Sequence, residues 1–242
     1  MLHLNRTALF AAVLSLACFT LHGSVATAPQ PLDQAEVIRR IDAAVALRVN
    51  SIAGYTVTEH YAVFHGDDQA HSTAEMTVKT TYKKDAGKTY DIVSESGSAM
   101  IRRLGLDPIL ASEKEINLPG NVEKSWIISA NYEMTVKPGG VQRIDGRDCL
   151  VLSINPKRKA TNLIVGNLWV DAQNFTIVRL EGVASKAPSI FAGSAHVMRQ
   201  YANIDGFAMA THAHAESSTF LYGKTVVTID YSNYSIQHLP GK

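Results

Sequence analysis

The clearest helical pattern in the chain follows residue 32. Apolar residues recur there at every fourth position, so one stripe of a helix would be buried while charged residues face water. The stripe consists of Val37, Ile41, Val45 and Val49. Asp33 and Glu36 stand three positions apart just before it, which is the spacing of an N-terminal capping pair. The pattern predicts an amphipathic helix that lies on a sheet.

Beyond Gly54 the period changes to the alternation that is typical of strands. Short segments rich in Val, Ile, Thr and aromatic residues are separated by polar or Gly-containing turns. We expect strands at residues 55–64, 74–83, 88–94, 126–136, 140–144, 149–154, 162–171, 175–181, 195–204, 207–220 and 225–236. We expect turns at Pro138-Gly139-Gly140 and Asp205-Gly206, and a break around Lys186-Ala187-Pro188. The close spacing of the segments favours an antiparallel sheet.

A second helical pattern interrupts the strands between residues 98 and 118. It contains Met100 and Leu104, a break at Gly105 and a new start at Asp107-Pro108. Asp at a cap followed by Pro at the first helical position is a common way to begin a helix. The segment predicts two short helices.

The N-terminus has the pattern of a secretory signal peptide. Residues 7–21 are almost wholly apolar, follow Arg6 and precede the small residues Ala26-Thr27-Ala28. We expect a signal peptide at residues 1–28, with cleavage after Ala28 or Ala26, and a single domain at 29–242. The apolar run is too short to span a membrane and continues past Cys18, so lipid anchoring through this cysteine is not expected. The sequence predicts a soluble protein of the periplasm or the secreted fraction.

The numbers of charged residues and of cysteines limit the kinds of partner and of cross-link that the chain can have. The chain has 23 Lys and Arg against 22 Asp and Glu, and this balance argues against a nucleic-acid partner. Once Cys18 is removed, Cys149 has no partner for an intramolecular disulfide, and its apolar strand indicates a small core or interface residue.

Catalytic motifs are absent from the sequence. It contains no G-x-S-x-G elbow, P-loop, G-x-G-x-x-G or H-E-x-x-H pattern. One weak metal candidate comes from the alternation of a strand, which would place His212, His214 and Glu216 on one face, with His196 as a neighbour. An exposed polar sheet face shows the same pattern. We therefore expect no catalysis, no metal and no cofactor.

Two adjacent strand segments carry a resemblance to a known family. Residues 166–171 read GNLWVD, and after a turn residues 177–181 read IVRLE. Together with the order of helix, hairpins, helical insert and strands, this motif resembles the periplasmic outer-membrane lipoprotein carrier (LolA/LolB-like) superfamily. The resemblance implies an α+β fold in which a strongly curved antiparallel sheet, an incomplete β-barrel, is covered by an N-terminal helix and a short helical lid. It also implies an apolar cavity inside the half-barrel, with the helices around residues 100–115 as the lid.

The function that this resemblance implies is the binding of apolar cargo. The cargo would be a lipid or the acyl chains of a lipoprotein, with a possible membrane-bound donor or acceptor protein, in outer-membrane lipoprotein sorting. The residues expected to line the cavity are Tyr55, Val57, Tyr61, Met76, Val78, Tyr90, Ile92, Trp126, Ile128, Tyr132 and Met134. The same side chains would also fill an ordinary packed core. The alternatives are an envelope-stress regulatory protein of the same fold and, with less support, a metal-dependent hydrolase.

Overall fold

The computed structural model describes residues 33–186, 195–219 and 223–240, all within the unit Leu32–Lys242. Its helical elements are α1 (Gln34–Ser51), α2 (Ala99–Ile101), the π-helix η1 (Arg102–Leu106), α3 (Asp107–Ile116) and the 3₁₀ helix η2 (Val122–Ser125). Its strands are β1 (Ile52–His65), β2 (Ala74–Lys83), β3 (Gly87–Gly97), β4 (Tyr132–Ile144), β5 (Arg147–Pro156), β6 (Ile164–Asp171), β7 (Ile177–Ala184), β8 (His196–Ile204), β9 (Phe207–Thr219) and β10 (Gly223–His238). The predicted signal peptide, Cys18 and the predicted break at 187–188 lie outside the described residues and stay predictions.

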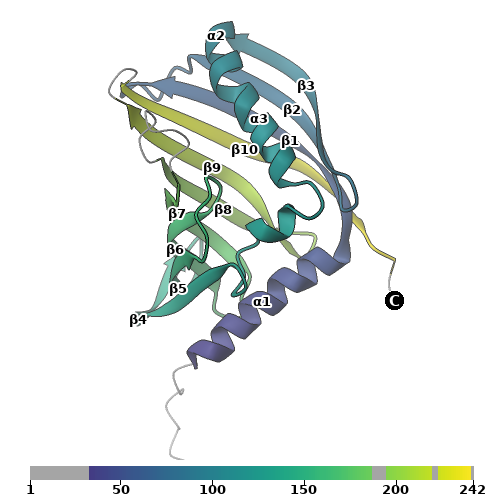
Figure 1. The fold of residues 1–242 in the computed structure, drawn as a ribbon, viewed down its shortest axis with the longest axis vertical. Coiled ribbons are helices and arrows are strands. Elements are labelled where there is room, and N and C mark those ends of the chain that lie inside the picture. The colour runs from purple at the N-terminus through teal and green to yellow at the C-terminus, as the bar shows by residue number, and fades with distance from the viewer. Residues whose placement is uncertain (1–32, 187–194, 220–222, 241–242) are drawn as a thin grey trace, which may run out of the picture. The chain divides into compact units, whose positions relative to one another are not determined.

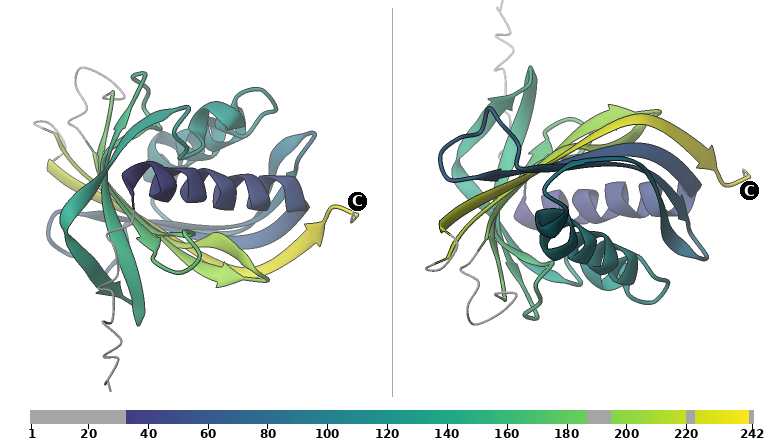
Figure 2. Two further views of the ribbon diagram at one scale, coloured as in Figure 1. Left: turned by 90° about the horizontal axis from the view of Figure 1, so that it is seen from below. Right: turned by 90° about the horizontal axis from the view of Figure 1, so that it is seen from above.

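All ten strands form one antiparallel sheet in the order β3-β2-β1-β10-β9-β8-β7-β6-β5-β4. The last strand, β10, lies between β1 and β9. The sheet twists and curves strongly, as strands do when their right-handed twist accumulates, and the helices lie on its concave side (Figures 1 and 2). Because β3 and β4 end the sheet without pairing to each other, the barrel is incomplete. The predicted fold class is confirmed.

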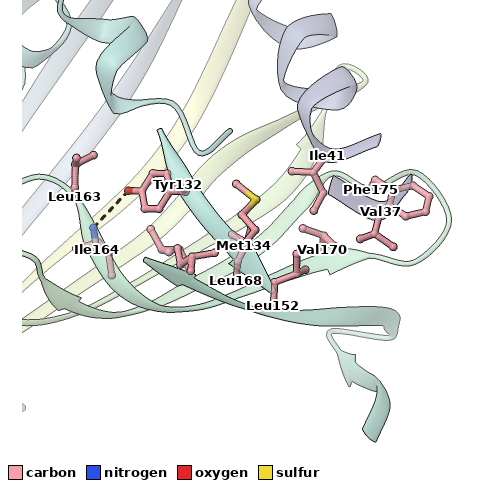
Figure 3. Packing of buried hydrophobic residues seen from close by; sticks show 12 residues of the cluster. Val37, Ile41, Tyr132, Met134, Leu152, Leu163, Ile164, Leu168, Val170 and Phe175 are labelled. Atoms are coloured by element: carbon pink, nitrogen blue, oxygen red, sulfur yellow. Dashed lines mark hydrogen bonds between the residues drawn. The ribbon is translucent and has the colours of Figure 1, made fainter. Parts of the chain in front are cut away.

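Helix α1 covers one end of the concave face. The Asp33 carboxylate accepts a hydrogen bond from the backbone N–H of Ala35, so Asp33 is the N-cap. The predicted partner Glu36 instead accepts hydrogen bonds from the Arg39 and Arg40 side chains. Val37 and Ile41 of its stripe are buried in the largest core cluster, which also contains residues of β4 to β7 (Figure 3). In that cluster the backbone N–H of Ile164 donates a hydrogen bond to the Tyr132 hydroxyl. The apolar stripe therefore packs α1 against strands β4 to β7.

The helical insert differs from the prediction at Gly105. The chain does not break there, because η1 continues directly into α3 through a π-helical turn. The predicted cap, Asp107, is already helical and lies in the first turn of α3, where Pro108 follows it. An acidic residue and a Pro in the first turn stabilise a helix even where neither is its cap. Asp107 and Pro108 therefore mark the start of α3 from within its first turn.

The prediction was also wrong at two places in β4. Residues 126–131 are not a strand, since η2 ends at Ser125, tight turns follow it and β4 begins only at Tyr132. Pro138-Gly139-Gly140 is not a turn between two strands. Val136 faces Leu152 and Val141 faces Leu150 of the same partner strand, so the Pro-Gly-Gly segment is a bulge within one strand.

No helix in the described ranges is both long enough and apolar enough to cross a bilayer.

Candidate functional site: a cavity with a charged wall

A cavity of about 1050 Å³ lies on the concave face of the sheet, beneath α1 and α3. Ligand pockets in proteins typically enclose about 300–1,000 Å³, so this one is at the upper end. Aliphatic and aromatic side chains make up much of its wall. They include Ile109 and Ile116 of α3, Trp126, Ile127, Ile164, Ile177, Leu180, Val197, Phe207, Met209, Val227 and Ile229.

A group of charged residues interrupts the apolar wall below α3. Lys88 Nζ lies 3.0 Å from Glu113 Oε2, and Arg199 Nη2 lies 3.8 Å from Glu113 Oε1. These residues come from β3, α3 and β8, so the pairs connect the helical insert to two distant strands of the sheet. All three line the cavity.

The electrostatics of the group follow from this geometry. The charge of Lys88 lowers the pKa of Glu113 to about 2, against the opposing effect of burial, and Arg199 adds to the lowering. Burial disfavours the charge of Lys88, but Glu113 and neighbouring groups outweigh it and raise the pKa of Lys88 well above its usual value. Glu113 and Lys88 therefore form a stable ion pair at neutral pH.

A second acidic residue, Glu59, lies deeper in the same wall. It is only 1% exposed, and its Oε2 accepts a hydrogen bond of 2.5 Å from the Tyr61 hydroxyl. Within the described part of the chain its Oε1 has no hydrogen-bond partner. Tyr231 of β10 faces it across the ladder and also lines the cavity, so a carboxylate and a phenol stand side by side on the inner surface.

The residues predicted to line a cavity fall into three groups. Tyr55, Trp126 and Tyr132 are among the lining residues. Val57, Tyr61, Met76, Val78 and Met134 are buried within the protein. Tyr90 and Ile128 are partly buried, whereas Ile92 is 54% exposed and does not face the cavity.

Sequence reasoning missed the charged group altogether. One signal was available, because Glu59 occupies the same inward register as Val57 and Tyr61 in the alternation of β1. No local signal marks Glu113 or Arg199, since they meet only when the helical insert folds over the sheet.

The weak metal candidate does not assemble into a site. His212 Nδ1 lies 2.7 Å from Asp230 Oδ1, whereas Glu216 pairs with Lys224 at 3.4 Å. His214 borders the cavity, and burial lowers its pKa. Across residues 33–186, 195–219 and 223–240, no group of three His, Cys, Asp or Glu side chains is arranged to hold a metal ion.

Cys149 is a free, fully buried cysteine. It packs with Val151, Trp169 and Val178 in a small cluster, apart from the main core that holds Leu152. Burial raises the pKa of its thiol, which disfavours the reactive thiolate.

No family model matches the chain, and no curated protein sequence matches it. Several solved structures do. A LolA superfamily protein from Nitrosomonas europaea is 14% identical, with a TM-score of 0.44 over 87% of this chain and 96% of that chain. An outer membrane lipoprotein-sorting protein domain from Vibrio parahaemolyticus is 14% identical, with a TM-score of 0.46 over 84% of this chain and 92% of that one.

A DUF1329 family protein from Desulfovibrio piger is 16% identical, with a TM-score of 0.40 over 83% of this chain and 93% of that chain.

Proposed function

We propose that this chain is a periplasmic or secreted binding protein that carries a lipid, or the acyl chains of a lipoprotein, in the cavity of its half-barrel. It performs no chemistry on this cargo and needs no cofactor. The observation that supports the proposal is the cavity of about 1050 Å³ whose wall is largely aliphatic and aromatic. Burial of a hydrocarbon chain there contributes roughly 0.8 kcal/mol per CH₂ group, so a long acyl chain would be held firmly.

The architecture suits such a carrier. The sheet forms only part of a barrel, and α1 and α3 contribute residues to the cavity wall from its open side. Small displacements of α3 would widen the entrance without unpairing any strand. We propose that α3, as the lid, admits cargo in this way and that a membrane-bound donor or acceptor protein exchanges it.

The proposal is tested by filling the cavity. Ala215 of β9 lines it, so Ala215→Trp should place an indole in the space that the cargo needs. We expect a large loss of binding of a fluorescent fatty acid, with little loss of fold by circular dichroism. Val183→Trp is the matched control, since Val183 is 39% exposed and lies outside the set of lining residues.

A second measurement identifies the natural cargo. The protein is purified from the periplasm without detergent, and an organic extract is analysed by mass spectrometry beside an unrelated exported protein. A phospholipid or acylated peptide in stoichiometric amount, present in Val183→Trp and missing from Ala215→Trp, would establish the carrier function. A clean extract with no fatty-acid uptake would contradict it.

A further inference from the structure

Arg199 stands out among the residues of the cavity wall because it is a cation on an otherwise apolar strand surface. It lies in β8, with Leu180 of β7 and Ala213 of β9 as its cross-strand neighbours. Both neighbours line the cavity, as do Val197 and Tyr201 along the strand. The side chain of Arg199 is 35% exposed, and since the residue lines the cavity, a molecule bound there can reach it.

The guanidinium of Arg199 has the side chains of Tyr201 and Glu113 as its neighbours. Its ion pair with Glu113 is long, at 3.8 Å, whereas Glu113 is held at 3.0 Å by Lys88. Within the described part of the chain, Arg199 Nε has no hydrogen-bond partner. A guanidinium has five N–H donors to satisfy, so this side chain can still donate to an acceptor on a bound molecule.

Other charged groups of the wall are already engaged. Arg40 of α1 pairs with Glu36 at 2.6 Å. The side chain of Lys88 is 10% exposed and already engaged, and Glu59 is 1% exposed and bonded to Tyr61. Arg48 of α1 is also a lining residue, but Arg199 differs from Arg40 and Lys88 in that its Nε has no hydrogen-bond partner within the described part of the chain. The planar guanidinium of Arg199 can donate two parallel hydrogen bonds to two oxygens of a carboxylate or a phosphate.

Building on the carrier function proposed above, we propose that Arg199 binds the oxyanion head group of the cargo, a carboxylate or a phosphate, while the hydrocarbon chain lies against the apolar wall. Glu113 holds the guanidinium from the side of α3, and Leu180 and Ala213 leave room beside it for a chain. The cavity is then a site for an anionic amphiphile, with a defined orientation of head and tail.

The test compares three probes of equal chain length, decanoate, decyl phosphate and decanol, by isothermal titration calorimetry at pH 7.5 with the whole exported protein. The wild type should bind at least one of the anions about tenfold or more tightly than the alcohol, because a hydrogen bond between charged groups is worth more than one between neutral groups. In Arg199→Gln this preference should disappear while decanol binding stays unchanged. Arg199→Lys, which keeps the charge and loses the fork, should retain part of it.

Arg179→Gln is the matched control. Arg179 lies in the neighbouring strand β7, pairs with Glu181 at 2.6 Å and is not among the residues that line the cavity. It should bind all three probes as the wild type does. The anion that binds more tightly tells whether the cargo is a free fatty acid or a phosphate-bearing lipid.

Two results would overturn the assignment of Arg199 while leaving the carrier function intact. In one, the wild type binds decanol as tightly as both anions. In the other, Arg199→Gln weakens decanol and decanoate equally, as a purely structural role in holding α3 would require. Failure of all three probes to bind the wild type would instead contradict the carrier function itself.

Discussion

At the scale of single residues, the pair Glu113 and Lys88 should dominate the acid sensitivity of the fold. The pKa of Glu113 is about 2, below its ordinary value of 4.5, and Lys88 is the main cause. A carboxylate whose pKa is lowered by folding stabilises the folded state at every pH above its ordinary pKa. This contribution is lost as the pH falls toward the pKa that the group has in the folded state. Glu113→Gln should therefore lower the free energy of unfolding at pH 7, by an amount that shrinks between about pH 4.5 and pH 2.

Urea denaturation of the wild type and of Glu113→Gln across this pH range measures the difference in their free energies of unfolding. Glu36→Gln provides a comparison, because Glu36 forms ion pairs with Arg39 and Arg40 on the exposed surface of α1 and such pairs contribute little. A difference between wild type and Glu113→Gln that stays constant down to pH 2 would show that the ion pair does not stabilise the fold.

At the scale of elements, β6 and β7 approach each other so closely that their facing glycines have no room for a side chain. A Cβ on Gly182 would lie 2.2 Å from the carbonyl oxygen of Val165, and one on Gly166 would lie 2.1 Å from that of Glu181. Gly182→Ala must push the strands apart, and overpacking of this kind costs about 1–3 kcal/mol or more. Thermal denaturation should show a clearly lowered midpoint.

Gly105→Ala is the informative contrast. Gly105 lies in the helical insert, and a Cβ added to it would meet no other atom within 4 Å, so alanine should raise stability by up to about 1 kcal/mol. Equal effects of the two substitutions would mean that the contact between β6 and β7 is looser than the structure has it.

The elements also show how far the sequence predicts this fold. Alternation located most strands because successive residues of a strand face opposite sides of the sheet, as in β5, where Leu152 and Val151 belong to different clusters. It failed at Trp126, whose aromatic character resembles a strand although the residue ends a 3₁₀ turn. It also failed at Gly139, where a positive φ of 114° accommodates a bulge that composition cannot distinguish from a hairpin turn.

At the scale of the whole molecule, neither the strand order nor the charged wall of the cavity could be derived from local patterns. Lys88, Glu113 and Arg199 lie far apart in the chain, and only the tertiary fold brings their charges within 4 Å. The same holds for β10, whose composition matches that of its neighbours while its position between β1 and β9 depends on long-range pairing. Pairings of this kind form late and slowly, because the loop they close is long.

The central position of β10 leads to a prediction about the entire sheet. A chain that ends at residue 222 would lose the strand that pairs with β1 from Ile52 to His65 and with β9 from His212 to Thr219. It would leave β3-β2-β1 as a separate three-stranded piece with an unpaired edge, and free edges of this kind promote aggregation. We expect the truncated chain to lack a cooperative unfolding transition and to accumulate in the insoluble fraction.

The matched control is a chain that ends at His238. It retains β10 and loses the hydrogen bond of 2.8 Å from the backbone N–H of Leu239 to the carbonyl of Ser51, so its unfolding midpoint should stay close to that of the wild type. Urea denaturation followed by tryptophan fluorescence compares the three proteins, with Trp126 and Trp169 as reporters. If the chain ending at 222 unfolds cooperatively as a monomer, then β4 to β9 form a sheet that is stable without β1 to β3, and β10 does not join two dependent halves.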